Sequence, residues 1–210
     1  MLISEEVVTS ILKKYNITVR GALHIGAHEC EEFDFYKRIG LAPRDIIWID
    51  AIDSNIVKAR ERGIPNVYNA IITDKDDVEV DFNISNNGAS SSILELHTHK
   101  ISHPDIVYVG KFSQESITVD SFFNRNDLDA TKYNLWNIDI QGAELLALKG
   151  GAESLKHVDI LYLEVNEKEL YKDCALVGEI DAFLLPGFTR IFTKIGKHGW
   201  GDAIYVRELR

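Results

Sequence analysis

Carboxylates stand at or near the ends of three short apolar segments of this chain. Asp50, Asp139 and Glu164 each follow or close a run rich in Ile and Leu. Runs of this kind are typical of strands that are covered on both faces of a sheet. Because the carboxyl ends of parallel strands lie along one edge, we expect the three acids to meet there. Like charges at one edge repel unless a ligand or a cation relieves them, so the pattern predicts a binding site.

The stretch from Asp139 to Glu144, with the sequence DIQGAE, carries the densest group of polar side chains. Gly142 permits a sharp turn there, and the leucines that follow have the spacing of a helix. Asp139, Glu144 and Asp120 are candidate general bases for proton removal from a substrate. We favour Asp139, because its position at a strand end is the best defined. The alternative interpretation is an ordinary strand-to-helix turn with incidental charges.

The same acids are candidates for a cation site. Asp139, Glu164 and Asp120 offer the carboxylate oxygens that suit Mg²⁺ or Mn²⁺. Histidines recur between 97 and 103, but no helix or strand period places them on one face. A solvated or substrate-facing loop is therefore favoured over a zinc site for these histidines.

A single glycine turn follows the first apolar run, at Gly26. Such a turn lets the backbone approach a ligand closely. Ala27, His28 and Cys30 stand where a dinucleotide fingerprint would place further glycines. This departure from the dinucleotide fingerprint disfavours a ligand with a pyrophosphate group and favours a smaller ligand that side chains recognise. His24 and His28 are candidate polar contacts, or else histidines that only complete the turn.

Asp50 lies 24 residues after Gly26. Carboxylates about 20 residues after the glycine turn bind ribose hydroxyls in related sheets. The reason is that a carboxylate can accept the hydrogens of both hydroxyls of a vicinal diol. The alternative is a strand-end aspartate that faces water.

Alternating strands and helices must position these residues. Strands are expected at 21–25, 44–50, 66–72, 78–82, 135–140, 158–166, 188–194 and 203–206, and helices at 4–15, 29–39, 55–62, 145–150 and 176–184. This order indicates an α/β fold, and the last two strands, with no helix between them, indicate an antiparallel hairpin. The periodicity of apolar residues weakens over 83–116, where we expect a long loop on the acceptor side.

Composition limits the class of protein. The chain has 210 residues and a formal net charge of −10, which disfavours nucleic acids and anionic membranes as partners. No signal peptide or membrane span is expected, and two distant cysteines without CxxC spacing indicate a reducing compartment. We expect one soluble, cytoplasmic domain over 1–210, with a helical cap at 1–20. The sequence does not indicate an oligomeric state.

Five motifs in this order resemble the FkbM-type methyltransferases. They are HIGAHE at 24–29, WIDA at 48–51, ITVDSF at 117–122, NIDIQGAEL at 137–145 and LEV at 163–165. The resemblance covers roughly 20–167, and its specific part is the fourth motif with the KGGA that follows at 149–152. It implies a Rossmann-like, seven-stranded methyltransferase sheet with helices on both faces, and S-adenosylmethionine as the cofactor.

The resemblance also implies a set of cofactor-binding residues. They are His24, Gly26, Ala27, His28, Asp50, Ala51, Ala70, Ile71, Asp139 and Gln141. Gly26 and Ala27 would border the methionine part, Asp50 the ribose, and Ala70 and Ile71 the adenine. Asp139 would lie beside the sulfonium, with Gln141 and Glu144 shaping the pocket. The sequence departs from the family at Asp50, where Glu is usual, and at Cys30, which replaces a glycine.

The implied reaction is an in-line attack of a substrate oxygen on the activated methyl group, with positioning as a main source of catalysis. The expected acceptor is a hydroxyl on a sugar, glycan or other small molecule, bound by the loop at 83–116 and the segment at 194–202. Trp200 and His198 are candidate sugar contacts there, or simply hairpin residues. Two alternatives are a non-catalytic binding protein on the same sheet and a nicotinamide-dependent oxidoreductase. The missing glycine fingerprint and the lack of a Tyr-xxx-Lys pair near a strand end disfavour the oxidoreductase.

Overall fold

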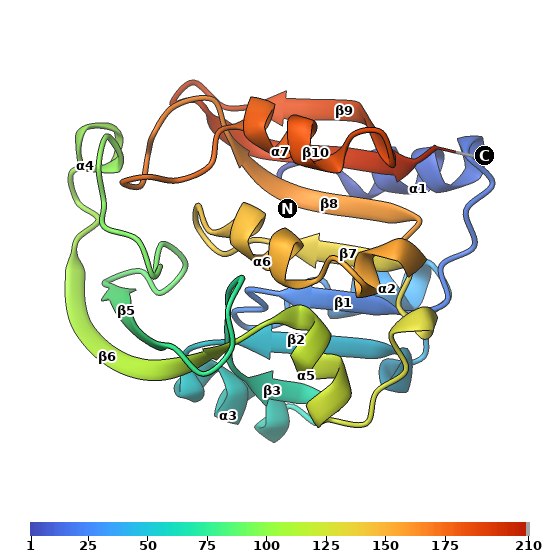
Figure 1. Cartoon of the computed structure of the whole chain (residues 1–210), viewed down its shortest axis with the longest axis horizontal. Coiled ribbons are helices and arrows are strands. Elements are labelled where there is room, and N and C mark those ends of the chain that lie inside the picture. The colour runs from blue at the N-terminus through green and yellow to red at the C-terminus, as the bar shows by residue number, and fades with distance from the viewer. Residues whose placement is uncertain (209–210) are drawn as a thin grey trace.

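The computed structural model describes residues 1–208, and its main sheet has seven strands (Figure 1). In spatial order they are β3 (Val67–Asn69), β2 (Ile46–Asp50), β1 (Ala22–Ile25), β7 (Leu135–Ile138), β8 (Ile160–Asn166), β10 (Trp200–Arg207) and β9 (Phe188–Ile195). β3 through β8 pair in parallel, whereas β10 is antiparallel to both β8 and β9. The predicted α/β class, the Rossmann-like seven-stranded sheet and the C-terminal antiparallel hairpin are confirmed.

Helices cover both faces of this sheet, as predicted. One face carries α5 (Val119–Arg125), α6 (Glu144–Gly150) and α7 (Val177–Leu184), which lie in front of the sheet in Figure 1. The other face carries α1 (Glu5–Lys14), α2 (Phe33–Arg38) and α3 (Asp53–Glu61). The 3-10 helices are η1 (Pro43–Asp45), η2 (Ala130–Lys132) and η3 (Ser154–His157). Within residues 1–208, no helix is long and apolar enough to cross a membrane.

A smaller sheet stands beyond the carboxyl ends of the parallel strands, at the left in Figure 1. It contains β4 (Ile71–Ile72), β6 (Tyr108–Ile117) and β5 (Glu79–Ser85), with the short helix α4 (His99–Ser102) nearby. The expected loop at 83–116 is therefore wrong at both of its ends, which belong to the hairpin of β5 and β6. Most of β6 is exposed or half-buried, so its sequence lacks the apolar alternation that indicates a strand.

Most other elements differ from the predicted bounds by a few residues at their ends, and two of the differences bear on the site. The strand expected at 66–72 is divided at Ala70, because β3 pairs with β2 and β4 pairs with β6 of the smaller sheet. The helix expected from residue 29 begins as α2 at Phe33. His28 and Cys30 have φ values of 44° and 57°, and this left-handed backbone cannot continue into an α-helix. Cys30 thus adopts a conformation that favours the glycine of the family motif.

The N-terminal segment before α1 lies across the ends of β8 and β10. The backbone N–H of Ile3 donates to the hydroxyl of Tyr162 at 3.1 Å. Lys194 donates to the carbonyl of Leu2 at 2.8 Å. These contacts join positions more than 150 residues apart in sequence and bring the start of the chain to the edge of the sheet where the acids lie.

Candidate functional site

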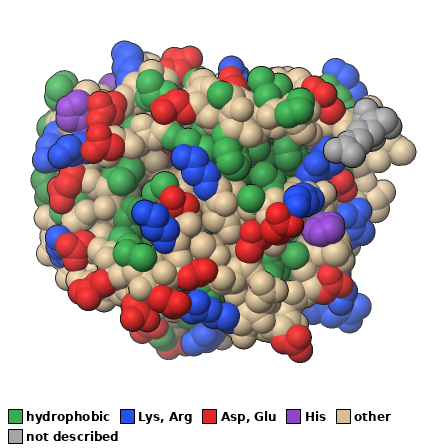
Figure 2. Space-filling view, viewed as in Figure 1, with side chains coloured by type: hydrophobic (Ala, Val, Ile, Leu, Met, Phe, Trp, Pro, Cys, Tyr) green, Lys and Arg blue, Asp and Glu red, His purple; other side chains and the backbone are tan. Residues whose placement is uncertain are grey.

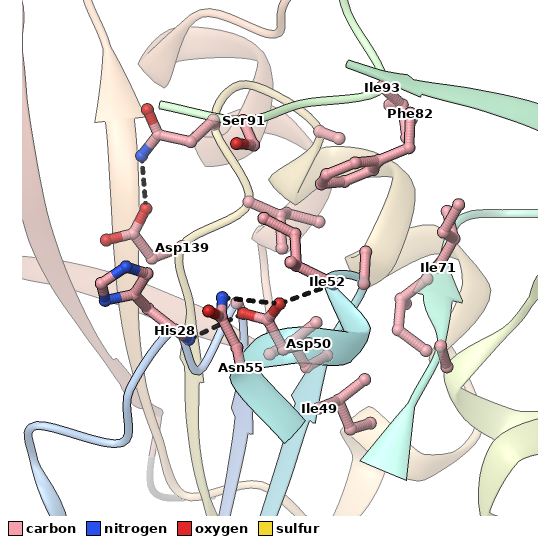
Figure 3. Close-up of a pocket in the computed structure, with 18 of the residues that line it drawn as sticks. His28, Ile49, Asp50, Ile52, Asn55, Ile71, Phe82, Ser91, Ile93 and Asp139 are labelled. Atoms are coloured by element: carbon pink, nitrogen blue, oxygen red, sulfur yellow. Dashed lines mark hydrogen bonds between the residues drawn. The ribbon is translucent and has the colours of Figure 1, made fainter. Parts of the chain in front are cut away.

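A narrow cavity of about 60 Å³ lies beyond the carboxyl ends of β1, β2 and β7 (Figure 3). The smaller sheet and the segment at 88–93 close its other side. Much of its wall is apolar and comes from Ile49, Ala51, Ile52, Ala70, Ile71, Ile72, Phe82 and Ile93. No Lys or Arg of the described chain lines it. Such a wall suits a flat aromatic ring, and the lack of cationic side chains disfavours a phosphate.

Asp50 forms the polar side of this cavity. Its carboxylate accepts hydrogen bonds from the backbone N–H of His28 at 2.7 Å, the backbone N–H of Ile52 at 2.8 Å and the Asn55 amide at 3.2 Å (Figure 3). Burial raises the pKa of Asp50, and these three donors oppose the shift. A carboxylate has about four acceptor positions. About one remains for a ligand, rather than the two that binding of both diol hydroxyls through Asp50 would need.

Gly26 and Asp139 bring β1 and β7 together below the cavity. Gly26 has φ of +84°, and a Cβ atom on it would lie 1.7 Å from the backbone oxygen of Asp139. Only glycine permits this backbone and this approach. The turn is fixed from the other side, because the N–H groups of Gly26 and Ala27 both donate to the carbonyl of Ile49. Gly26 and Asp139 line the cavity, whereas Ala27 is buried below it in the core.

The two histidines of the first motif separate in the structure. His28 lines the cavity, and its Nδ1 lies 2.7 Å from Oε1 of Glu31, a contact that raises the pKa of His28. His24 lines neither this cavity nor the larger one beside it. It is 3% exposed, stacks on Trp48 and bonds the hydroxyl of Tyr36 at 3.1 Å. Burial lowers the pKa of His24, so it is a neutral core residue and not a cofactor contact.

A second cavity of about 350 Å³ adjoins the first. Its lining comes from four parts of the chain: the N-terminal segment, the 87–106 region, the ends of β7, β8 and β10, and the 170–171 segment. Ala89, Asp139 and Gln141 line both cavities. Asp139 thus lies between a slot with many apolar residues and a larger space in which polar and charged residues are more frequent.

Gln141 orients Asp139 between the two cavities. Its Nε2 donates to Oδ1 of Asp139 at 2.7 Å and to Oε2 of Glu164 at 3.0 Å. Its Oε1 accepts from the hydroxyl of Tyr171 at 2.5 Å. Burial raises the pKa of Asp139 to about 6, against the opposing bond from Gln141, and also raises the pKa of Glu164. A side-chain hydrogen bond also links Asp139 to Glu164, and it contributes to the raised pKa of Glu164.

The family model for the methyltransferase FkbM domain matches residues 24–190. The chain belongs to this family. Methyl transfer is the activity that the family implies, with S-adenosylmethionine as donor. No curated protein matches the sequence. Among solved structures, a SAM-dependent methyltransferase from Aquifex aeolicus aligns over 99% of this chain and 91% of its own, with 11% identity and a TM-score of 0.45.

Glu144 of the FkbM motif supports the turn instead of lining a cavity. Its Oε1 accepts from the backbone N–H groups of Ile140 at 2.9 Å and Gly142 at 3.1 Å. The residue is completely buried, and Oε2 has no hydrogen-bond partner. Burial raises the pKa of Glu144 to about 7. A side chain enclosed in this way cannot reach a substrate, so Glu144 is not a suitable general base.

Asp120 is also removed from the candidate site. Its carboxylate accepts from the backbone N–H groups of Ser154 at 2.8 Å and Glu153 at 3.0 Å, at the start of η3. It lines neither cavity. The carboxylate of Asp120 therefore has a structural role, because it joins α5 to the start of η3. The sequence alone could not distinguish this role from a catalytic one.

The suggested metal site has no support. Within residues 1–208, no group of three or more His, Cys, Asp or Glu side chains is arranged to hold a metal ion. Asp139 and Glu164 do approach each other, but the amide of Gln141 bridges them. A hydrogen-bond donor of the protein, rather than a cation, therefore joins these two carboxylates.

The histidines from 97 to 103 divide between surface and site. His97 is exposed, with Nδ1 3.0 Å from the carbonyl of Glu169. His99 and His103 line the second cavity, and their ring centroids are 5.0 Å apart. The ring of His198 lies 4.9 Å from that of His103. Two of the three histidines thus line a cavity, and their contact with a substrate stays a prediction.

Sequence reasoning missed Asp202, Tyr171 and the N-terminal residues as parts of the second cavity. Asp202 is 4% exposed and lies opposite Glu164 in the pairing of β10 with β8. An aspartate inside an otherwise apolar strand was a usable signal, because burying a charge needs a reason. No local pattern marked Tyr171 or the start of the chain.

Proposed function

We propose that the protein transfers a methyl group from S-adenosylmethionine to a hydroxyl of a sugar or other small molecule, with Asp139 as the general base. One observation carries the proposal: Asp139 separates a cation-free cavity with many apolar residues from a larger one in which polar and charged residues are more frequent. A nucleoside in the first cavity and an acceptor in the second would meet at this carboxylate. Reacting groups held next to each other gain much of the rate enhancement from proximity.

The first cavity fits the nucleoside of S-adenosylmethionine better than a dinucleotide. The apolar wall with Ile71 and Phe82 matches an adenine ring, and Asp50 keeps about one acceptor position for a ribose hydroxyl. S-adenosylmethionine has no phosphate, in agreement with a wall that lacks Lys and Arg.

The residues around Asp139 prepare it to accept a proton. With a pKa raised to about 6, Asp139 is mostly ionised at neutral pH yet more basic than an ordinary aspartate. Gln141 holds Oδ1, and we assign Oδ2 to the acceptor hydroxyl. When bound, S-adenosylmethionine would supply the methyl group and leave as S-adenosylhomocysteine. Asp139 would take the proton of the acceptor hydroxyl.

The acceptor we propose is a small molecule or glycan and not a nucleic acid. The net charge of −10 repels phosphate backbones. On the face drawn in Figure 2, Lys and Arg side chains are scattered among Asp and Glu rather than gathered in one patch. A nucleic-acid site generally needs such a patch.

Calorimetry with S-adenosylhomocysteine tests the cofactor assignment. We expect the wild-type protein and Asp139→Asn to bind it, and Ala70→Phe, which fills the first cavity, to lose at least tenfold in affinity. Transfer of a labelled methyl group to a panel of hydroxyl compounds then tests the assignment of Asp139 as the general base. Asp139→Asn should reduce turnover by about 10²–10⁴-fold. Failure of the folded wild-type protein to bind S-adenosylhomocysteine would refute the proposal.

A further inference from the structure

The second cavity contains three carboxylates from three different strands or strand ends. Asp139 follows β7, Glu164 belongs to β8 and Asp202 to β10. Glu164 and Asp202 are each 4% exposed and lie directly opposite each other in the antiparallel pair. Placing carboxylates together in a buried wall costs free energy, unless a positive group or protons reduce their charge.

No Lys or Arg of the described chain lines this cavity. Lys194, on the neighbouring strand, donates to the carbonyl of Leu2 instead. The amino group of Met1, which also lies at this wall, contacts Oε1 of Glu32 at 3.4 Å. Oδ2 of Asp202 accepts from the hydroxyl of Tyr162 and from backbone N–H groups, all of which are uncharged donors. Within residues 1–208, no Lys or Arg side chain therefore neutralises the wall, and the single Met1 ammonium, which is attracted to Asp139 and Asp202 as well as to Glu32, offsets only part of its charge.

Aromatic and imidazole groups form another part of the lining. Tyr171 and Trp200 line the cavity, and aromatic rings of this kind can attract cations. His99 is 6% exposed, and its Nδ1 has no hydrogen-bond partner in the described chain. Burial and the neighbouring His103 lower the pKa of His99, so it is neutral at pH 7. A neutral imidazole adds no positive charge that would offset the acids, and it can accept a hydrogen from a ligand.

We propose that the acceptor carries a protonated amine close to its reacting hydroxyl, and that Glu164 and Asp202 bind this amine. The proposal rests on the proposed function, because it names the substrate class of the same site. An acceptor with a phosphate or carboxylate near the hydroxyl is excluded by like-charge repulsion. A neutral sugar would bring no positive charge to acids whose charge the Met1 ammonium offsets only in part, and it would gain nothing from them beyond ordinary hydrogen bonds.

Ligand-observed NMR titrations with matched compounds test this inference. The panel contains amino sugars and amino alcohols, each with its N-acetylated form and its neutral hydroxyl analogue, together with glucose 6-phosphate. We expect at least one amine to bind tenfold or more tightly than its N-acetylated form. Binding of that amine should weaken at least tenfold in Glu164→Gln and Asp202→Asn. Glu115→Gln removes an exposed charge on β6 and is the matched control, for which no change is expected.

Three results would overturn the inference. They are equal binding of amines and their N-acetylated forms, preference for glucose 6-phosphate, and no binding of any amine. Titrations are run with and without S-adenosylhomocysteine, and binding of that nucleoside is measured in the same samples. Failure of amine binding with intact nucleoside binding refutes the amine acceptor alone, whereas loss of nucleoside binding refutes the proposed function.

The amino group of the cofactor is the main competitor for these acids. S-adenosylhomocysteine carries that amine, and 5′-methylthioadenosine lacks it. If Glu164→Gln and Asp202→Asn weaken only S-adenosylhomocysteine, the acids bind the cofactor and the inference is wrong. We expect both nucleosides to keep their wild-type affinities in the two variants.

Discussion

Replacement of Glu144 distinguishes a residue that supports the turn from one that performs catalysis. Glu144→Ala leaves the N–H groups of Ile140 and Gly142 without their acceptor. Each unsatisfied buried donor costs about 1–3 kcal/mol, so we expect a loss of about 2–6 kcal/mol in the free energy of unfolding. Glu144→Gln retains an oxygen for both donors and should cost less. Because Glu144 lines neither cavity, Glu144→Gln should also keep the wild-type methyl-transfer rate.

The pH dependence of Glu144→Gln gives the sharper test. The carboxyl has a pKa of about 7 in the folded protein, raised by burial above its ordinary value of 4.5. The folded state therefore holds the proton more tightly, and the stability that this proton contributes is lost as pH rises towards 7. Between pH 5 and pH 8 the wild type should lose about 2–3 kcal/mol relative to Glu144→Gln, which does not titrate.

Urea denaturation of wild type, Glu144→Gln and Glu144→Ala at both pH values measures these differences. The comparison of wild type with Glu144→Gln cancels the titration of distant groups. A difference that does not change with pH would show that the carboxyl is not buried in the folded protein. Loss of methyl transfer in a stably folded Glu144→Gln would restore Glu144 as a candidate base.

Three further substitutions test other parts of the site. The rate of methyl transfer should fall about tenfold per pH unit below pH 6, because Asp139 must be ionised to accept a proton. The residual activity of Asp139→Asn should not show this acidic limb of the pH–rate profile. Gly26→Ala should destabilise the fold by more than the roughly 1–2 kcal/mol of a left-handed alanine, because its Cβ meets a backbone oxygen; thermal unfolding measures this. Asp120→Asn should cost about 1 kcal/mol through weaker contacts to Glu153 and Ser154, with kcat unchanged in a steady-state assay.

The strand-end acids could be located from the sequence because their signal is local. Asp50 and Asp139 each follow or close a strand that is buried on both faces, and such strands have continuous apolar runs. The register of parallel strands then brings these ends to one edge. The family motifs agree with this placement, so most of the polar lining of the first cavity follows from the sequence.

The second cavity depends on contacts between distant parts of the chain. Ile3 bonds Tyr162, and Asp202 stands opposite Glu164, and neither pairing leaves a periodic pattern in the sequence. The same holds for β6, whose exposed residues are ordered by pairing with β5 and not by apolar alternation. The acceptor side was therefore the least predictable part of the site.

Gln141 shows how the motif serves both cavities. Its amide donates to Asp139 and Glu164 and accepts from Tyr171, three roles that a carboxylate at this position could not combine. A third acid would also add repulsion between groups whose pKa values are already raised. Gln141 reaches these partners from a left-handed backbone with φ of 56°, which costs about 1–2 kcal/mol. Glu144 accepts hydrogen bonds from the N–H groups on either side of Gln141, and these bonds hold that conformation. Glu144 therefore influences Asp139 indirectly, because it fixes the turn that lies between the two residues.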